Sequence, residues 1–250
     1  MEKWIRRGAT VLAVVLIGPL VVAFGGDVKL DADWRTADRS PAGIAPAADT
    51  EPRAVVQVYA ARAFNWRGLF AVHTWLAVKP AGAGHYTVHQ VVGWRAWHGR
   101  PVVVSHNDQP DRKWYGQAPQ LLLDLRGETA AAVIDSIHAA VRDYPYANRY
   151  TLWPGPNSNT FTAFVGRRVP ELRLHLPATA IGKDFLSNGA VFASAPSGTG
   201  YQLSIYGLLG ATAAWHEGFE LNVLGLTFGI DLRRPAIKFP GLGRVGMATG

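Results

Sequence analysis

The feature that most constrains this chain is an uncharged apolar run near its N-terminus. Residues 8–26 carry no charged side chain, and between the terminal glycines the run reads ATVLAVVLIGPLVVAF. A helix rises 1.5 Å per residue, so this run is about long enough to cross a hydrocarbon core roughly 30 Å thick. We therefore expect residues 1–26 to form a transmembrane signal-anchor.

The charges on either side of this run predict its orientation. Three cations precede it, namely Lys3, Arg6 and Arg7, and the acidic residues that follow it are Asp27, Asp31 and Asp33, interspersed with Lys29 and Arg35. The positive-inside rule then places the N-terminus in the cytoplasm. The expected location is a bacterial inner membrane, with a single pass, membrane lipid as partner of residues 8–26, and the C-terminal domain facing the periplasm.

Two other interpretations of the run are less favourable. A cleaved signal peptide needs a small-x-small site, and Ala23-Phe24-Gly25 is a poor version of one. A buried core helix normally keeps a polar stripe, and this run has none.

Composition excludes several classes of function. The chain has 250 residues and no cysteine, so thiol catalysis, disulfides and thiolate metal sites are ruled out. Its net charge of +7 is dispersed and forms no recognisable module, which argues against a nucleic-acid partner. We expect no cofactor and no metal, because the spacing of the candidate ligands matches no compact motif: His85, His89, His98, His106 and Asp108.

Hydrophobic patterning divides the rest of the chain into a spacer and one domain. Residues 27–53 are rich in Ala, Pro and Asp and are predicted to be an extended spacer. Residues 54–250 are predicted to form a single globular α+β domain. Its first part alternates in strand-like fashion, and we expect an antiparallel meander with strands at 54–61, 69–78, 86–94 and 101–105.

Helices are expected next, and strands return near the C-terminus. The predicted helices cover 119–126, 128–142 and a segment from Asn157 or Ser158 to just before Pro170. Residues 171–200 are predicted to be irregular, followed by two long strands at 201–209 and 219–230. A second membrane hairpin over 201–230 is the alternative, disfavoured by His216, Glu217 and Glu220. The expected fold class is therefore α+β, an antiparallel sheet packed on two or three helices, preceded by one N-terminal transmembrane helix.

Two histidines are candidates for chemistry because they fall on neighbouring predicted strands. If the intervening turn centres near Ala81, His73 and His89 face each other on one side of the sheet. Two adjacent imidazoles can act as a general base and its orienting partner. The alternative is that each is a half-buried strand histidine bonded to a neighbour.

A serine at a predicted helix start is the candidate nucleophile. Ser158 lies in GPNSNTF, where free backbone N–H groups and the helix dipole stabilise negative charge. A nucleophile there gains stabilisation of its anion, and an oxyanion can be held nearby. The alternative is that Ser158 or Asn157 is an ordinary helix cap.

The segments FAVHTWLAVKPAGAGHYTVHQVVGW, GPNSNTF and GLLG…FELNVLGLTFGID resemble a family of bacterial membrane-anchored proteins known only as a domain of unknown function. The likeness covers most of residues 34–245 and implies no activity. A remoter resemblance is to the permuted papain-like superfamily, which includes lecithin:retinol acyltransferase-like proteins and PPPDE peptidases. It implies a permuted papain-like fold in which a histidine strand precedes the helix that carries the nucleophile.

This second resemblance assigns roles to particular residues. His73 matches the base, His89 the second histidine and Ser158 the nucleophile, where the family has Cys. Supporting roles are expected for Asn157, Asn159, Trp75 and Trp94. A serine hydroxyl needs a positioned base throughout the reaction. The chain is thus expected to be either an envelope hydrolase or acyltransferase acting on an ester or amide, or a non-catalytic envelope binding or maintenance protein on the same scaffold.

Overall fold

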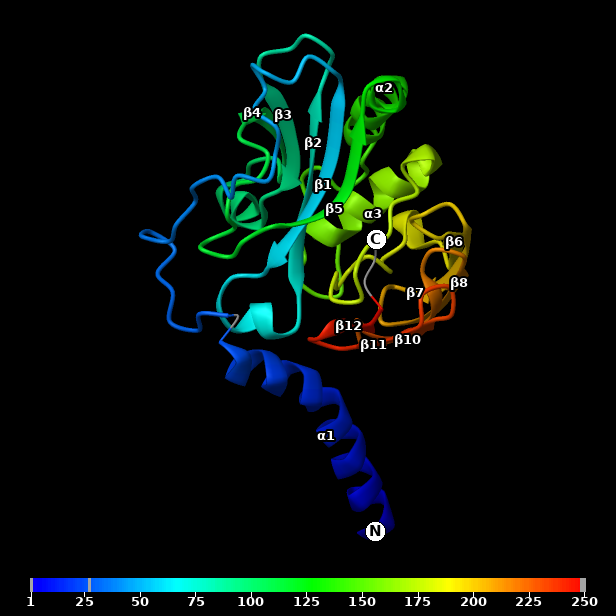
Figure 1. Cartoon of the computed structure of the whole chain (residues 1–250). Coiled ribbons are helices and arrows are strands. Elements are labelled where there is room, and N and C mark those ends of the chain that lie inside the picture. Colours follow the sequence, from blue (N-terminus) through cyan, green and yellow to red (C-terminus); the bar gives the residue numbers. More distant parts are fainter. Residues whose placement is uncertain (1, 27, 248–250) are drawn as a thin grey trace.

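The N-terminal helix projects away from a two-sheet body (Figure 1). The computed structural model describes residues 2–26 and 28–247; Asp27, one of the flanking acidic residues, lies outside them. Helix α1 spans Glu2–Gly25, and near its end Gly18 packs so closely on the carbonyl of Pro240 that a Cβ would collide with it. Over the described part of the chain, no helix has both the length and the hydropathy needed to cross a membrane.

The first sheet has five antiparallel strands in the order β4-β3-β2-β1-β5. Their bounds are β1 Val55–Arg62, β2 Val72–Lys79, β3 Tyr86–Val91, β4 Val103–Asp108 and β5 Gln120–Arg126. Two short 3-10 helices lie between them, η1 at Asn65–Leu69 and η2 at Gly93–His98. The four predicted strands are therefore present, with ends that differ by a few residues.

Strand β5 occupies Gln120–Arg126, so the helix predicted at 119–126 is wrong. Strand β5 pairs with β1, which would otherwise be an unpaired edge next to a fully buried face. Leaving the backbone N–H and C=O groups of β1 unpaired costs more free energy than is gained by beginning a helix at Pro119. Gly127, with φ at 67°, then turns the chain directly into the next helix.

Two helices cover one face of this sheet. Helix α2 spans Glu128–Arg142, as predicted, and α3 spans Ser158–Arg168. Ile137 of α2 and Phe161 of α3 are fully buried against Leu76 and its neighbours in the main core. The opposite face carries a smaller cluster around Tyr59 and Trp75.

The predicted spacer packs on that opposite face rather than standing free. The Asp111 carboxylate accepts hydrogen bonds from the backbone N–H groups of Ile44 and Ala45, at 2.8 and 3.2 Å. The Tyr86 hydroxyl donates to the Pro46 carbonyl at 2.9 Å. These contacts hold residues 44–46 of the predicted spacer against the body.

The second sheet is a seven-stranded antiparallel meander, with strands β6 to β12 adjacent in chain order. Their bounds are β6 Phe192–Ser194, β7 Gly200–Ile205, β8 Leu209–Ala214, β9 Gly218–Val223, β10 Leu226–Asp231, β11 Ala236–Phe239 and β12 Gly243–Gly246. It follows two further 3-10 turns, η3 at Pro170–Leu172 and η4 at Ser187–Gly189.

The two long strands predicted in this region are wrong in number and length. The expected strand at 219–230 is a hairpin, β9 and β10, because Leu224 and Gly225 both adopt positive φ and close a tight turn. Tyr206 and Gly207 close the turn between β7 and β8 in the same way. Strands β6, β8, β11 and β12 were not predicted, and β6 lies within the segment expected to be irregular.

Candidate functional site

The register of β2 and β3 puts His73 and His89 on opposite faces of the first sheet. Leu76 is paired with His89, so these two side chains share a face. His73 lies three positions from Leu76 and therefore points the other way. The predicted imidazole pair is wrong, because the actual register differs by an odd number of residues from a turn centred at Ala81.

His73 is enclosed by aromatic rings on the spacer side of the sheet. Its ring stacks on Trp114, with centroids 3.6 Å apart and planes at 9°, and lies 5.7 Å from the ring of Trp75. Its Nε2 is 3.4 Å from Gln90 Oε1. Burial lowers the pKa of His73 to about 3, against the smaller opposing effect of Gln90. A base is most effective when its pKa lies near the working pH, so His73 is poorly tuned for proton transfer.

The predicted supporting tryptophans belong to this aromatic cluster. Trp75 stacks on Tyr59 at 5.5 Å and donates its Nε1–H to the Pro110 carbonyl at 2.7 Å. Trp94, on η2, stacks on Trp114 at 6.1 Å. Trp75 therefore lies next to His73, whereas Trp94 is linked to His73 only through Trp114, and neither tryptophan is placed beside Ser158 by these contacts.

His89 lies on the helix-facing side with partners that sequence reasoning missed. Its Nδ1 is 2.7 Å from the hydroxyl of Ser105 on β4, and its ring meets that of His138 on α2 edge to face at 5.1 Å. The Nε2 of His89 is buried without a hydrogen-bond partner. Burial, together with His138 and His106, lowers the pKa of His89 to about 4. The predicted meander makes β3 and β4 neighbours, but the register that sets Ser105 opposite His89 was not predicted.

Ser158 opens α3 as predicted, and the residues around it are arranged as a helix cap. Asn157 is the N-cap; its Oδ1 accepts from the backbone N–H groups of Asn159 and Thr160, and Thr160 completes a capping box. Ser158 is 7% exposed. No hydrogen bond joins its hydroxyl to an imidazole among the residues that the structure describes.

Helix α3 is tied at its start to β2 and to the loop before the second sheet. The Thr74 hydroxyl lies 3.0 Å from Asn159 Oδ1 and 3.4 Å from the Ser158 carbonyl. The side-chain amides of Asn157 and Asn159 both donate to the Ile181 carbonyl, at 3.0 and 2.8 Å. These buried polar side chains join the start of α3 to β2 and to the loop at Ile181, so their burial has a structural reason.

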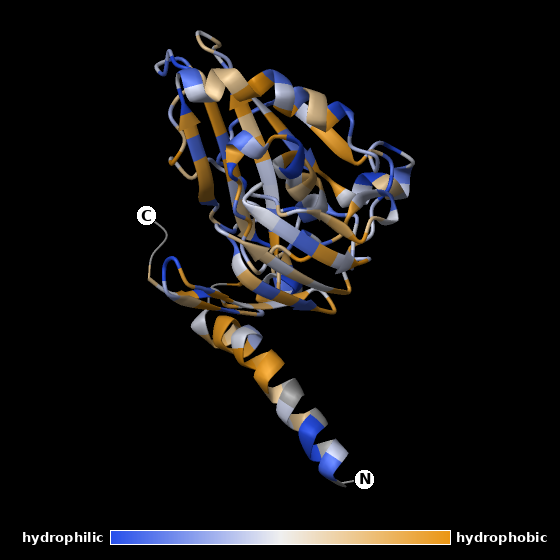
Figure 2. Ribbon diagram, turned by 90° about the vertical axis from the view of Figure 1, so that its right-hand side faces the viewer, coloured by the Kyte–Doolittle hydropathy of each residue, from blue (hydrophilic) through white to orange (hydrophobic). Residues whose placement is uncertain are grey.

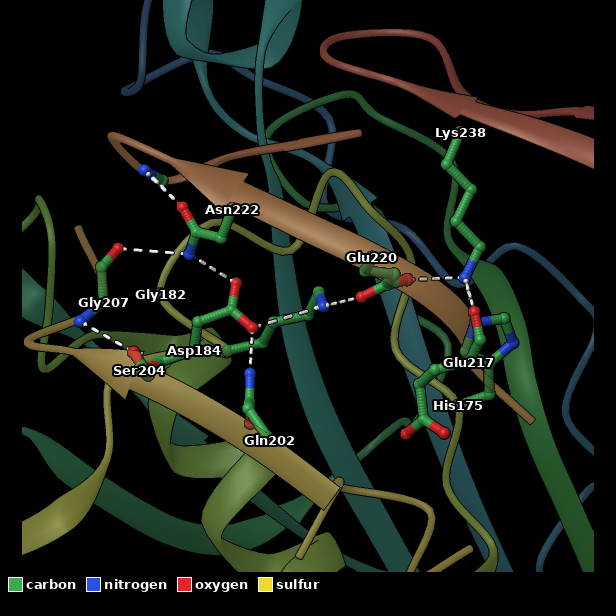
Figure 3. Close-up of polar contacts among 12 residues, drawn as sticks. His175, Gly182, Asp184, Gln202, Ser204, Gly207, Glu217, Glu220, Asn222 and Lys238 are labelled. Atoms are coloured by element: carbon green, nitrogen blue, oxygen red, sulfur yellow. Dashed lines mark hydrogen bonds and ion pairs between the residues drawn. The ribbon is translucent and has the colours of Figure 1, made fainter. Parts of the chain in front are cut away.

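A second buried polar cluster connects this loop to the second sheet (Figure 3). Glu220 of β9 bridges the ammonium groups of Lys183 and Lys238, and Lys238 also donates to the Glu217 carbonyl at 2.7 Å. Asp184 accepts from the side-chain amides of Gln202 and Asn222. No local pattern predicts that these residues, which are far apart in the chain, lie together.

The charges in this cluster depend on one another. Burial alone would raise the pKa of Glu220, but Lys183 and Lys238 hold it at about 2. Burial opposes the charge of Lys183, yet Asp184 and Glu220 keep its pKa above the ordinary value. The cluster is a neutralised internal network that fastens the second sheet to the body.

Comparison with known families gives one match, over residues 53–185, described as a protein of unknown function (DUF3750). The chain belongs to the DUF3750 family. The DUF3750 match covers His73, His89 and Ser158, and it ends at Phe185, directly after the two loop residues that bind the second sheet. No curated protein and no solved structure matches the chain.

Two cavities lie outside these residues. One, of about 550 Å³, is lined by Tyr146, Arg149, Phe185, Asn188 and Tyr206 among others, close to the turn that precedes α3. The other, of about 630 Å³, lies on the second sheet. Neither is lined by His73, His89, Ser105 or Ser158.

Proposed function

We propose that this DUF3750 protein is a membrane-anchored, non-catalytic binding or maintenance protein of the bacterial envelope, held to the lipid by α1. The observation that carries the proposal is the separation of the candidate catalytic groups. His73 faces the aromatic cluster, His89 faces α2, and Ser158 serves the start of α3. A catalytic serine needs a base within hydrogen-bond reach, and among the described residues no imidazole bonds to the Ser158 hydroxyl. The serine that does contact a histidine is Ser105, and the pKa of its partner His89 is lowered to about 4 by burial and by the neighbouring His138 and His106.

The remote papain-like relationship is proposed for the scaffold only. The strand that carries His73, β2, precedes the helix that begins at Ser158, and this helix packs against the strand through Thr74. This order of elements supports the relationship. In the proposed scaffold, the serine that replaces cysteine has a structural role.

Anchoring through α1 is proposed from charge and exposure. The run at 8–26 lacks charges and follows three cations, and α1 projects from the body (Figure 2). Among its described side chains, Ile17, Leu20, Val21 and Phe24 are about half exposed or more. An exposed apolar helix is unfavourable in water and favourable in lipid.

A binding role needs a cleft, and the 550 Å³ cavity is the proposed one. It combines aromatic rings, from Tyr146, Phe185 and Tyr206, with the cation of Arg149 and the amide of Asn188. A few polar groups set among aromatic walls are typical of ligand sites. The DUF3750 match covers Tyr146, Arg149 and Phe185.

The test is labelling of the full chain, in detergent micelles, with a fluorophosphonate probe that reacts with activated serines. We expect no labelling above that of the heat-denatured protein, because the Ser158 hydroxyl bonds to no imidazole among the described residues and the pKa of the imidazole beside Ser105 is lowered to about 4. Ser158→Ala and Ser105→Ala are the matched variants. Labelling that either variant abolishes would overturn the non-catalytic proposal and identify the nucleophile.

A further inference from the structure

The second sheet has its polar side chains inside and its apolar side chains outside. On β7, Gln202 and Ser204 are buried whereas Tyr201, Leu203 and Ile205 are exposed. An antiparallel sheet with one solvated face normally shows the reverse alternation. The inner face is polar because it covers Lys183 and Asp184, so the apolar residues are forced outward.

The same reversal continues across neighbouring strands and forms one apolar face. Leu221 of β9 is 61% exposed, between buried Glu220 and Asn222. We define the apolar face by its exposed members on β7, β8, β9, β10, β11 and β12: Tyr201, Leu203, Ile205, Leu209, Phe219, Leu221, Val223, Ile230, Ile237 and Val245. A contiguous exposed apolar patch of this kind marks an interaction surface.

The apolar face is hollowed along β8. Ala211 and Ala213 are paired with Leu203 and Tyr201 on one side and with Leu221 and Phe219 on the other. Small side chains between large ones leave the cavity of about 630 Å³, which these residues line. Its walls are almost wholly apolar, which suits hydrocarbon rather than a polar ligand.

The charges around the apolar face are complementary to an anionic surface. Within residues 186–247, all of them described, the acidic side chains are Glu217, Glu220 and Asp231, and each is buried. The turn between β10 and β11 carries Arg233 and Arg234. A second copy of the chain would bring the same cations and no exposed carboxylate from this region, whereas anionic lipid headgroups attract them.

The position of α1 brings lipid to the same place. Gly18 and Pro19 of α1 contact the segment from Pro240 to Leu242, which connects β11 to β12. The apolar run continues to Gly26, about 12 Å further along a helix at 1.5 Å per residue. If residues 8–26 lie in the bilayer, the edge of the sheet at β11 and β12 therefore lies within the bilayer as well, and not in the water above it.

We propose that the apolar face docks on and partly enters the lipid bilayer, with acyl chains filling the hollow over Ala211 and Ala213. The proposal deepens the proposed function, on whose anchor it rests, by adding a second lipid contact. The body then lies on the membrane in a fixed orientation, with the turn between β2 and β3 directed away from the bilayer (Figure 1).

The absence of native cysteine allows a direct test on the full chain. Single cysteines replace Leu221, Leu203, Val14 or Ala81, and each is labelled with the environment-sensitive fluorophore NBD. The protein is reconstituted in vesicles of equal parts phosphatidylethanolamine and phosphatidylglycerol, with or without nitroxide groups on the acyl chains. Leu221 and Leu203 report on the apolar face, Val14 on α1, and Ala81 on the β2–β3 turn as the control.

We expect the labels at positions 221 and 203 to shift to the blue and lose at least half of their emission to nitroxide, with position 81 unchanged. Quenching at position 14 without quenching at 221 and 203 would overturn the docking proposal and leave the anchor intact. If none of the positions is quenched, both the anchor and the docking are wrong. A shielded but unquenched label at 221, with disulfide cross-links between two unlabelled L221C chains, would assign the face to a second copy and overturn lipid docking.

Discussion

Replacing Glu220 by Gln should destabilise the protein by about 3–5 kcal/mol, because it leaves two buried ammonium groups facing a neutral amide. The pKa of Glu220 falls from 4.5 to about 2, and at about 1.4 kcal/mol per pH unit this difference corresponds to about 3 kcal/mol. Removal of one partner from a buried ion pair costs about 3–5 kcal/mol in general. Glu220 is 3% exposed, so solvent screens the effect little.

The sign of the pH dependence follows from the same value. Because the pKa of Glu220 is lower in the folded chain, its stabilisation is complete above pH 4.5 and is lost as the pH falls through about 2. Urea unfolding of the full chain in detergent micelles, followed by tryptophan fluorescence, measures the change. The E220Q variant should lose this part of the acid dependence.

A matched exposed pair provides the control. Asp143 and Arg168 are 3.0 Å apart, and both side chains are more than half exposed. Asp143→Asn should therefore cost less than about 1 kcal/mol. If E220Q costs no more than D143N, the buried network does not fasten the second sheet and the reasoning is refuted. The E220Q/K238M double variant should lose less stability than the sum of the two single variants. It leaves one ammonium group facing the amide, that of Lys183, and this group still has Asp184 at 3.5 Å.

Two further predictions concern the candidate site. Burial lowers the pKa of His73 to about 3 and that of His89 to about 4. Each histidine therefore stays neutral on folding, and stability falls as the pH drops below about 6.5. His89→Gln should reduce this acid slope by about 1.4 kcal/mol per pH unit, and an unchanged slope in urea titrations would contradict the shift. Asn157→Ala should reduce the free energy of unfolding by about 2–3 kcal/mol, because it removes a cap and two further hydrogen bonds. Ser158→Ala should reduce it by less than about 1 kcal/mol. Equal losses of stability in calorimetry would argue against this division of roles.

Local patterns were sufficient where neighbours in sequence are also neighbours in space. Helix α2 has the predicted bounds, since its apolar stripe and the glycine before it are both local signals. The start of α3 was predicted at Asn157 or Ser158, because Asn and Ser are both preferred caps, and Asn157 is the residue that caps the helix. For the same reason, β1 and β2 lie within a few residues of their expected positions.

The errors arise where a distant partner decides the outcome. Strand β5 exists because β1, more than 60 residues earlier, offers an open edge. The register of β2 on β3 differs from the predicted one, and it places His89 on the opposite face of the sheet from His73. The predicted pair of imidazoles is therefore absent. The inverted second sheet depends on Lys183 and Asp184, whose contacts with it no local pattern could reveal. The turn between β9 and β10 includes Leu224 at positive φ, and leucine is not one of the residue types that predict a turn.

The chain-order pairing of β6 to β12 has a consequence for how the protein is made. Every strand of that meander pairs with its neighbour in sequence, so the hairpins need no distant partner and can form early in folding. Their polar face meets Lys183 and Asp184 only when the body is in place, and their apolar face is left exposed by the part of the chain that the structure describes. A sheet that has formed before it packs against the body and the membrane exposes this apolar face and is prone to self-association. We therefore expect overproduction without membranes to yield aggregates, and co-translational supply of nanodiscs to yield monomers.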